Sequence, residues 1–112
     1  MAAHISHKEF SRLEIRVGTI TGAEPASGTR QPAYQLTIDF GGFGQRSSSA
    51  QLTDHYEPSD LIGRQVIALV NLPPKRIAGF VSEVLVLGAY EPDGSVRLLQ
   101  PDSPVENGSR LQ

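Results

Sequence analysis

Apolar and polar residues alternate in two stretches of the chain, residues 13–17 and residues 34–40. A period of two is that of a β-strand with one face toward the core and the other toward solvent. The next apolar residue after the first stretch is Ile20, which falls out of phase. A β-bulge at Gly18 would produce this slip and would curve the strand as a small barrel requires.

Three further stretches predict the remaining strands. Residues 65–72 and residues 84–87 are continuously apolar and contain β-branched side chains, which indicates strands covered on both faces. Residues 46–52 contain three consecutive serines and are only weakly amphipathic. We expect them to form a strand with hydroxyl groups along at least one face.

A short helix is expected near the N-terminus. Ser6 and Glu9 have the spacing of a capping box, in which the hydroxyl and the carboxylate each bind a free amide of the first turn. This predicts a helix over about residues 6–12, with Phe10 and Leu13 as its buried contacts.

A second short helix is expected between the third and fourth strands. Residues 53–61 offer Asp54 as a cap and Pro58 as a first-turn residue, and Gly63 would end the helix. Three strands, a helix and two further strands follow the order of an OB-fold, a five-stranded Greek-key barrel. The sequence therefore predicts an all-β barrel of this kind in one domain, residues 1–112.

The two ends of the chain exceed what a five-stranded barrel needs. Residues 91–94 predict a hairpin turn and residues 95–100 an additional strand. The N-terminal helix and the extension from about residue 89 to 112 add apolar side chains that a symmetric partner would cover, which predicts a homodimer. The alternative is that both additions fold back on their own barrel. The expected interface residues are Phe10, Leu98, Leu99 and Val105.

Composition narrows the class of protein. The absence of cysteine removes disulfides and thiolate metal sites, and it suits a reducing compartment. No apolar run approaches the roughly 20 residues of a membrane span, and residues 1–10 lack the apolar centre of a signal peptide. We therefore expect a cytoplasmic protein without membrane insertion.

The sequence offers little for catalysis or cofactors. No serine stands in the G-x-S-x-G setting of a hydrolase nucleophile, and His55 beside Asp54 is expected to be a surface pair. His4 and His7 lie in a terminus that gives no metal geometry. Residues 41–44 are rich in glycine but lack the Lys-Ser/Thr ending of a phosphate-binding loop. We expect a protein that is not an enzyme and that binds no metal or other cofactor.

Charge is modest overall and uneven along the chain. With 10 basic and 12 acidic side chains the net charge is −2, so the overall field does not favour generic nucleic-acid binding. From residue 25 to residue 82, however, five cations stand against four acids. Any basic face is therefore expected in the middle of the chain.

Residues 71–83, just before the last apolar strand, combine charge with apolar surface. Two prolines that cannot donate to a sheet ladder come first, so Lys75 and Arg76 are expected in a stiff, exposed loop. Gly79 allows a sharp bend or the close approach of another group. Such a loop suits a binding edge, although a β-hairpin whose charges are merely solvated fits the same residues.

The string from Asn71 to Ala89, NLPPKRIAGFVSEVLVLGA, resembles the signature of the tRNA-binding-domain superfamily, OB-fold modules found alone or appended to aminoacyl-tRNA synthetases. Within it, the sequence is most similar to the CsaA family of secretion-related chaperones. Other matching stretches extend the resemblance over nearly the whole chain. They are residues 13–20, 30–34, 48–51, 61–66 and 98–102.

The resemblance implies a homodimeric, non-enzymatic molecular chaperone whose partners are exported or unfolded polypeptides. A chaperone of this kind needs an exposed apolar cavity that accepts many sequences, with charge at its rim. The peptide-binding residues that meet this requirement are Lys75, Arg76, Ile77, Phe80 and Val81.

The alternative implied by the resemblance is a tRNA- or RNA-binding module. In tRNA-binding domains the loop before the last barrel strand, and the serine within it, contribute to the RNA surface. The residues to which this points are Asn71, Lys75, Arg76 and Ser82, with Arg46 and Arg64 as further cations. The sequence departs from tRNA-binding domains at Val84-Leu85, where Gly-Met is usual, and in residues 25–32, which lack the H-P-x-A-x-x-L pattern. Both departures are toward CsaA.

Overall fold

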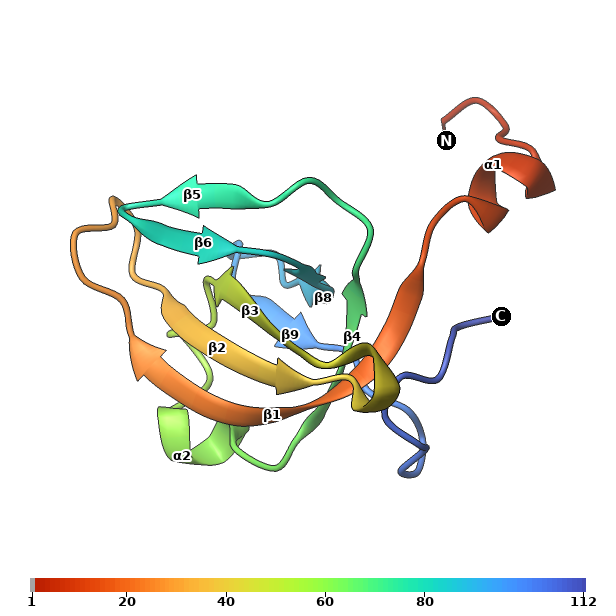
Figure 1. Ribbon diagram of the computed structural model, residues 1–112. Helices are drawn as coiled ribbons and strands as arrows, with labels where there is room; N and C mark the ends of the chain where they lie inside the picture. Colours follow the sequence, from red (N-terminus) through yellow and green to blue (C-terminus); the bar gives the residue numbers. More distant parts are fainter. Residues whose placement is uncertain (1) are drawn as a thin grey trace.

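The computed structural model describes residues 2–112 and consists mostly of strands (Figure 1). Five strands form one curved sheet in the order β3-β2-β1-β4-β7, and two hairpins stand beside it. The main sheet contains β1 (Ile15–Pro25), β2 (Tyr34–Asp39), β3 (Gln45–Ala50), β4 (Gln65–Leu69) and β7 (Leu85–Val86). The hairpins pair β5 (Lys75–Ile77) with β6 (Phe80–Ser82), and β8 (Gly88–Tyr90) with β9 (Val96–Leu98). The helical elements are α1 (His7–Ser11), the short 3-10 helix η1 (Gly41–Phe43) and α2 (Pro58–Leu61).

The long strand β1 joins the two halves of the barrel. Its first half pairs antiparallel with β4, and its second half pairs antiparallel with β2. The ladder to β2 shifts register between Ile20 and Gly22, so the predicted bulge exists but its placement at Gly18 was wrong. Gly18 has another role, because a Cβ there would lie 2.7 Å from Ile38 Cγ2 and 2.8 Å from the Phe40 ring. The absent side chain lets the core approach β1 closely.

The barrel is nearly closed by contacts between β3 and the segment that leads into β7. The backbone N–H groups of Glu83 and Val84 both donate to the Ser47 carbonyl, at 2.9 and 3.2 Å. The buried Ser48 hydroxyl donates to the Val84 carbonyl at 2.8 Å. The serine-rich third strand was therefore predicted correctly, and its hydroxyl groups help to close the barrel. The all-β OB-type architecture is confirmed.

The core lies inside this barrel. Its fully buried members come from β1, from alternate positions of β2 and β4, from α2 and from the residue that follows β2. They include Ile20, Leu36, Ile38, Phe40, Leu61, Val66 and Ala68. Tyr34 is also buried, and its hydroxyl donates to the Tyr56 carbonyl at 2.7 Å. Burial, with smaller contributions from Glu57 and Asp60, raises the pKa of Tyr34 above its ordinary value of 10.0.

The N-terminal helix α1 is present and begins with the predicted capping box. The Ser6 hydroxyl accepts from Glu9 N at 3.0 Å, and the Glu9 carboxylate accepts from Ser6 N at 2.9 Å. The prediction that Phe10 and Leu13 are buried was wrong, since they are 41% and 38% exposed. The reason is that α1 stands away from the barrel (Figure 1), and none of its residues is buried.

The second helix, α2, is confirmed with a different cap. Glu57 and Asp60 form its capping box, in which the Asp60 carboxylate accepts from Glu57 N at 2.9 Å. Asp54, the predicted cap, lies too early in the chain to contact the first turn. Pro58 is the first helical residue, and Gly63 follows the helix with a φ of 89°.

The apolar run 84–87 was predicted as a strand covered on both faces, and that prediction was wrong for Leu85. Val84 is buried, but β7 has only two residues and Leu85 is 48% exposed. Within the described residues 2–112, β7 is an edge strand that pairs with β4 alone. The apolar stretch 65–72 also ends early as a strand, because β4 stops at Leu69.

The C-terminal extension contains the predicted hairpin, β8–β9, and a tail that runs along β1. In the tail, Gly108 N donates to the Val17 carbonyl at 2.7 Å, and Leu111 N donates to the Ile15 carbonyl at 2.9 Å. The tail therefore folds back on its own barrel and covers the part of β1 that β2 leaves free. Within residues 2–112, no helix has the length and apolar character that crossing a membrane requires.

Candidate binding surface around Ser49

The charged segment before β7 forms a hairpin. Lys75 lies opposite Ser82, and Ile77 lies opposite Phe80, across a turn made by Ala78 and Gly79. Both turn residues have positive φ, 50° and 85°. Two left-handed residues give a tight two-residue turn whose twist matches the paired strands. The expectation of a loop at Lys75 was therefore wrong, because the segment is a β-hairpin.

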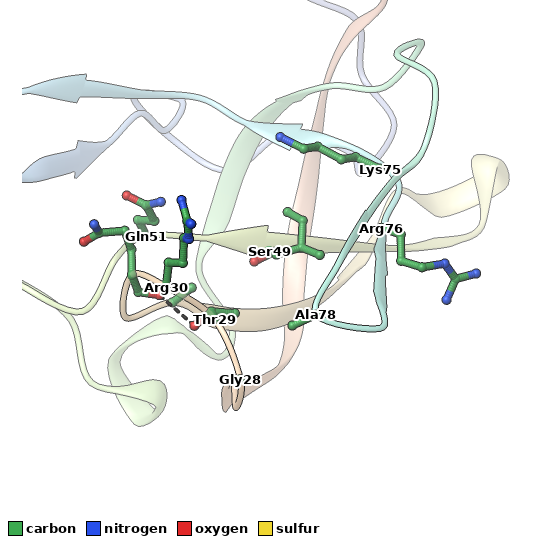
Figure 2. Close-up of a pocket in the computed structure, with 11 residues that line it drawn as sticks. Gly28, Thr29, Arg30, Ser49, Gln51, Lys75, Arg76 and Ala78 are labelled. Atoms are coloured by element: carbon green, nitrogen blue, oxygen red, sulfur yellow. Dashed lines mark hydrogen bonds between the residues drawn. The ribbon is translucent and has the colours of Figure 1, made fainter.

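The hairpin separates the two neighbouring cations. Successive side chains of a strand point to opposite faces, whereas directly paired residues share a face. Lys75 therefore shares a face with Ser82, and Arg76 shares the other face with Val81. Figure 2 shows Lys75 reaching over β3 and Arg76 pointing away from it. The Arg76 guanidinium donates to the Gly79 carbonyl at 3.2 Å.

A cleft of about 420 Å³ lies between this hairpin and the loop that joins β1 to β2, and we call it the cationic cleft. Arg30 enters it from the loop and Lys75 from the hairpin, and both point toward the same part of the cleft in Figure 2. Ser49 and Gln51 form its floor (Figure 2). No acidic side chain lines it, so the cleft favours a ligand that carries negative charge.

A second hollow, of about 270 Å³, adjoins the first, and we call it the apolar cleft. Leu72, Ile77, Val84 and Leu85 provide its apolar lining. Its one carboxylate, from Glu83, already accepts from the Ser47 N–H and the Ser47 hydroxyl, each at 3.0 Å. The apolar cleft therefore offers hydrophobic surface with Lys75 at its border.

A third hollow, of about 350 Å³, lies between residues 49–52 of the β3 segment and residues 85–88 of the β7 segment, and we call it the seam cleft. Tyr90, 82% exposed, also lines it. All three clefts share Ser49, while Lys75 belongs to the first two and Leu85 to the second and third. They form one continuous surface around Ser49, cationic at one side and apolar at the centre.

Phe80 and Val81, two of the predicted peptide-binding residues, line none of these three clefts. Phe80 is half-buried opposite Ile77, and Val81 is exposed on the outer face of the hairpin. Of the predicted peptide-binding set, the structure brings together Lys75, Ile77 and the backbone of Arg76.

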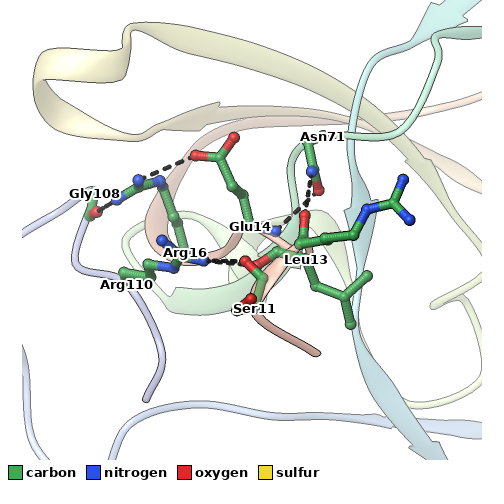
Figure 3. Close-up of polar contacts among 8 residues, drawn as sticks. Ser11, Leu13, Glu14, Arg16, Asn71, Gly108 and Arg110 are labelled. Carbon is green, nitrogen blue, oxygen red and sulfur yellow. Dashed lines mark hydrogen bonds and ion pairs between the residues drawn. The ribbon is translucent and has the colours of Figure 1, made fainter. Parts of the chain in front are cut away.

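Two of the predicted RNA-binding residues hold the fold together. Asn71 accepts from Glu14 N at 2.9 Å and donates to the Arg12 carbonyl at 2.7 Å, so it fixes the start of β1 (Figure 3). The Ser82 hydroxyl accepts from Ser49 N at 2.9 Å and so joins the hairpin to β3.

Two further predicted RNA-binding residues, Arg46 and Arg64, lie apart from the three clefts. Arg46 is exposed and lines a separate hollow with Phe43. The Arg64 guanidinium lies 5.2 Å from the Tyr56 ring centroid and donates to Gln100 at 3.3 Å. The candidate cations therefore do not form one patch.

Three of the predicted dimer residues expose apolar surface. Phe10 is 41%, Leu99 41% and Val105 43% exposed. Leu98 instead packs against the core of its own chain.

His55, expected to pair with Asp54, contacts the turn of the β8–β9 hairpin. Its Nε2 lies 2.7 Å from the Ser95 hydroxyl, which itself donates to the Asp93 carboxylate at 2.6 Å. A hydroxyl has one proton, so Ser95 accepts from His55 and the ring cannot act as its base in this arrangement. The group anchors the hairpin. Among residues 2–112, no three His, Cys, Asp or Glu side chains gather as a metal site would need.

Sequence reasoning missed Arg30, Ser49 and Leu85 as surface residues. Arg30 was noted only as one of several cations, and it reaches the cleft because the β1–β2 loop folds over β3. Leu85 was missed because it lies in the apolar run 84–87, which was predicted to be covered on both faces. Turn-forming residues on both sides of Arg30 were the available signal that it belongs to an exposed loop.

Comparison with protein families and solved structures finds a tRNA-binding domain family and CsaA chaperones. The tRNA binding domain family model matches residues 15–110. The crystal structure of chaperone CsaA from Bacillus anthracis superposes with a TM-score of 0.94 at 50% identity, covering 98% of this chain and all of that one. The CsaA chaperone from Picrophilus torridus gives a TM-score of 0.91 at 46% identity, covering 97% of this chain and all of that one.

Curated relatives include much longer proteins. The methionine–tRNA ligase of Porphyromonas gingivalis is 35% identical over 112 residues, which is all of this chain and 16% of the ligase. The chain thus spans about one sixth of the length of the ligases that it matches.

Proposed function

The chain belongs to the tRNA-binding-domain family, within which it is of the CsaA type, and from this premise we propose that it is a non-enzymatic chaperone that binds exported or unfolded polypeptides. The observation that carries the proposal is the apolar cleft. Leu72 and Leu85 are 42% and 48% exposed, and both line this one hollow. Exposed apolar surface within a hollow is what a protein that binds unfolded segments needs.

A position beside Lys75 suits the cleft to this function. Burial of apolar side chains is non-directional, so a cleft of this kind accepts many sequences. A nearby cation raises the rate of encounter without fixing the sequence. As part of the same proposal, the chaperone acts in the cytoplasm as a homodimer, with α1 and the exposed Leu99 and Val105 at the interface.

tRNA binding is the second candidate function. The family match and the ligase relatives favour it, as does the cationic cleft between the β1–β2 loop and the β5–β6 hairpin. OB-folds bind oligonucleotides with the loops that occupy these positions. Stacking platforms are scarce, however, because no aromatic side chain lines the cationic or the apolar cleft.

Fluorescence anisotropy with a labelled, unfolded preprotein segment tests the first proposal, in parallel with labelled tRNA. We expect the segment to bind with an affinity that changes little across a salt series, because screening weakens exposed charge pairs but not apolar burial. Leu85→Ser should weaken binding roughly three- to tenfold, since part of a leucine contact is lost. Ile62→Ser is the matched control, because Ile62 is 54% exposed and lines none of the three clefts.

The same titrations separate the two functions. Binding of tRNA with a steep salt dependence, together with no measurable binding of the unfolded segment, would replace the chaperone proposal by RNA binding. Equal effects of Leu85→Ser and Ile62→Ser would remove the apolar cleft from the proposal.

A further inference from the structure

The edge of β3 is only partly used by the chain itself. Ser47 N, Ser47 O and Ser49 N all make hydrogen bonds on the side of β3 that faces away from β2. Hydrogen-bonding groups of a strand alternate between its two edges, so the Ser49 carbonyl points to the same side. Within residues 2–112 no backbone hydrogen bond joins Ser49 or Gln51 to β7. The β3 edge is therefore open from the Ser49 carbonyl onward.

β7 presents the facing edge. Leu87 N donates to the Ile67 carbonyl at 2.8 Å, so Leu87 points its backbone groups toward β4. The preceding residue, Val86, must then direct its N–H and carbonyl away from β4, into the seam cleft. No backbone hydrogen bond from β3 reaches Val86 in the described part of the chain. Two strand edges thus face the same hollow with free backbone groups.

We propose that a client polypeptide binds as an extended segment whose backbone pairs with this open edge at Ser49 and Val86, and that an acidic side chain of the client lies between Arg30 and Lys75. The inference rests on the proposed chaperone function and specifies its ligand. Strand addition gives affinity through main-chain hydrogen bonds, which every sequence can make. It thereby explains how one surface serves clients of different sequence.

The three clefts can accept side chains of the bound segment. A segment that crosses Ser49 borders all three clefts, because Ser49 belongs to each. An apolar client residue enters the apolar cleft against Leu72 and Leu85. The cationic cleft, lined by cations without an acid, complements a client carboxylate. The structure thus selects extended segments in which an acidic residue stands near an apolar one.

A polypeptide fits this surface better than RNA does. The free groups at Ser49 and Val86 are backbone donors and acceptors that line one hollow, and another backbone can pair with them. RNA binding on an OB-fold needs aromatic platforms for its bases, and Tyr90 is the one aromatic residue that lines any of the three clefts.

A backbone N-methyl scan tests the strand pairing. The probe is a labelled, unstructured peptide of alternating leucine and serine with one central aspartate, and each variant carries one N-methyl group. We expect affinity to fall roughly two- to tenfold at the position whose N–H reaches the Ser49 carbonyl and at the position whose N–H reaches the Val86 carbonyl, since each methyl group removes one hydrogen bond. These two positions lie an odd number of residues apart, because the two N–H groups leave opposite edges of the bound segment. Equal effects at every position, or none, would overturn strand pairing while leaving the chaperone proposal intact. If neither this peptide nor the unfolded preprotein segment binds, the proposed function itself fails.

A mutant cycle tests the acidic contact with the same peptide. Replacing its aspartate by asparagine should weaken binding several-fold to the wild-type protein but have little effect with Lys75→Ala, and Lys75→Arg should restore the difference. Arg97→Ala is the control, since Arg97 is a well-exposed cation that lines none of the clefts. If replacing the aspartate by asparagine lowers the affinity equally for the wild-type protein and for Lys75→Ala, then Lys75 does not bind the client carboxylate. A different outcome would assign the cleft to RNA: tRNA competes with the peptide only when both Arg30 and Lys75 are present, and the exchange of aspartate for asparagine in the peptide does not change its affinity.

Discussion

The two hairpins beside the main sheet, β5–β6 and β8–β9, have the same architecture but are attached in opposite ways. β8–β9 is fixed near both its ends: the buried Ser95 contacts His55, and Leu98 N donates to the Tyr56 hydroxyl at 3.0 Å. β5–β6 is joined to β3 through Ser82 and through the Ser47 hydroxyl, which donates to the Val81 carbonyl at 2.6 Å, while nothing lies within 4 Å of a Cβ at Gly79 in its turn. One hairpin is packed into the fold, and the other borders the clefts.

Because the two hairpins are attached differently, we expect one to contribute mainly to stability and the other mainly to binding. Side chains of β8–β9 that contact the barrel contribute to folding, so their loss should lower the free energy of unfolding. Exposed side chains of β5–β6 contribute little to folding, so their loss should change binding and leave stability almost unaltered.

Gly88→Ala should give the largest loss. A Cβ at Gly88 would lie 2.5 Å from Val96 Cγ1 and 2.8 Å from the Arg97 carbonyl oxygen, so the hairpin must move apart. We expect unfolding to become easier by about 1–3 kcal/mol, the usual cost of overpacking. Gly42→Ala is the control, because its Cβ would meet nothing within 4 Å and its φ is not positive. Urea titration measures both, and equal midpoints would contradict the packed state of β8–β9.

Tyr56→Phe should cost about 1 kcal/mol. It leaves Leu98 N–H without its acceptor, and a lost neutral hydrogen bond has roughly this effect. Thermal unfolding checks the value. Tyr90→Phe is the control, since Tyr90 is 82% exposed in the same hairpin and its hydroxyl makes no hydrogen bond within residues 2–112. A Tyr90→Phe loss as large as that of Tyr56→Phe would count against the proposed anchor.

Acid should weaken the turn of β8–β9. The Ser95 hydroxyl and N–H, which donate to Asp93, hold the pKa of that carboxyl below its ordinary value of 3.8, with smaller help from His55. The folded pKa is lower than the unfolded one, so this stabilisation is present above pH 3.8 and is lost as the pH falls through the folded value. The difference in melting temperature between wild type and Asp93→Asn should therefore shrink in acid. A difference that stays constant from neutral pH into strong acid would show that the charge of Asp93 is irrelevant.

Lys75→Ala should change stability least, by less than about 0.5 kcal/mol, because the side chain is exposed. Its effect should appear in the affinity for an unfolded polypeptide, and Arg76→Ala should have a smaller effect because Arg76 points away from the cleft (Figure 2). Calorimetric titration and thermal unfolding of the two variants separate binding from folding. A larger binding loss for Arg76→Ala would mean that the outer face of the hairpin is the contact surface.

Local patterns in the sequence were sufficient for the barrel but not for its surface. The alternation in residues 34–40 places Leu36, Ile38 and Phe40 inside, and the structure agrees, because a period of two depends only on neighbours in the chain. The Ser6–Glu9 cap was predictable for the same reason. Leu85 was not, since an apolar run has the same sequence in a central strand as at a sheet edge.

The clefts depend on contacts between residues far apart in the chain. Arg30, Ser49 and Lys75 meet only because the β1–β2 loop and the β5–β6 hairpin both lie against β3, and no spacing in the sequence encodes that meeting. The separation of Lys75 from Arg76 likewise depends on whether the segment is a loop or a hairpin. The segment forms a hairpin because Ala78 and Gly79 both adopt left-handed backbone conformations, and alanine is rare in that conformation.

Hydrogen exchange of the protein with and without an excess of unfolded preprotein segment tests the binding surface most directly. We expect the amides of residues 49–51, 75–77 and 85–87 to exchange more slowly in the complex, because the bound segment covers the open edge and the clefts beside it. Residues 15–19 should be unchanged, since that part of β1 is already paired with β4 and with the C-terminal tail and lines none of the three clefts. Slower exchange confined to α1 and residues 99–105, with no change around Ser49, would contradict the assignment of client binding to these clefts.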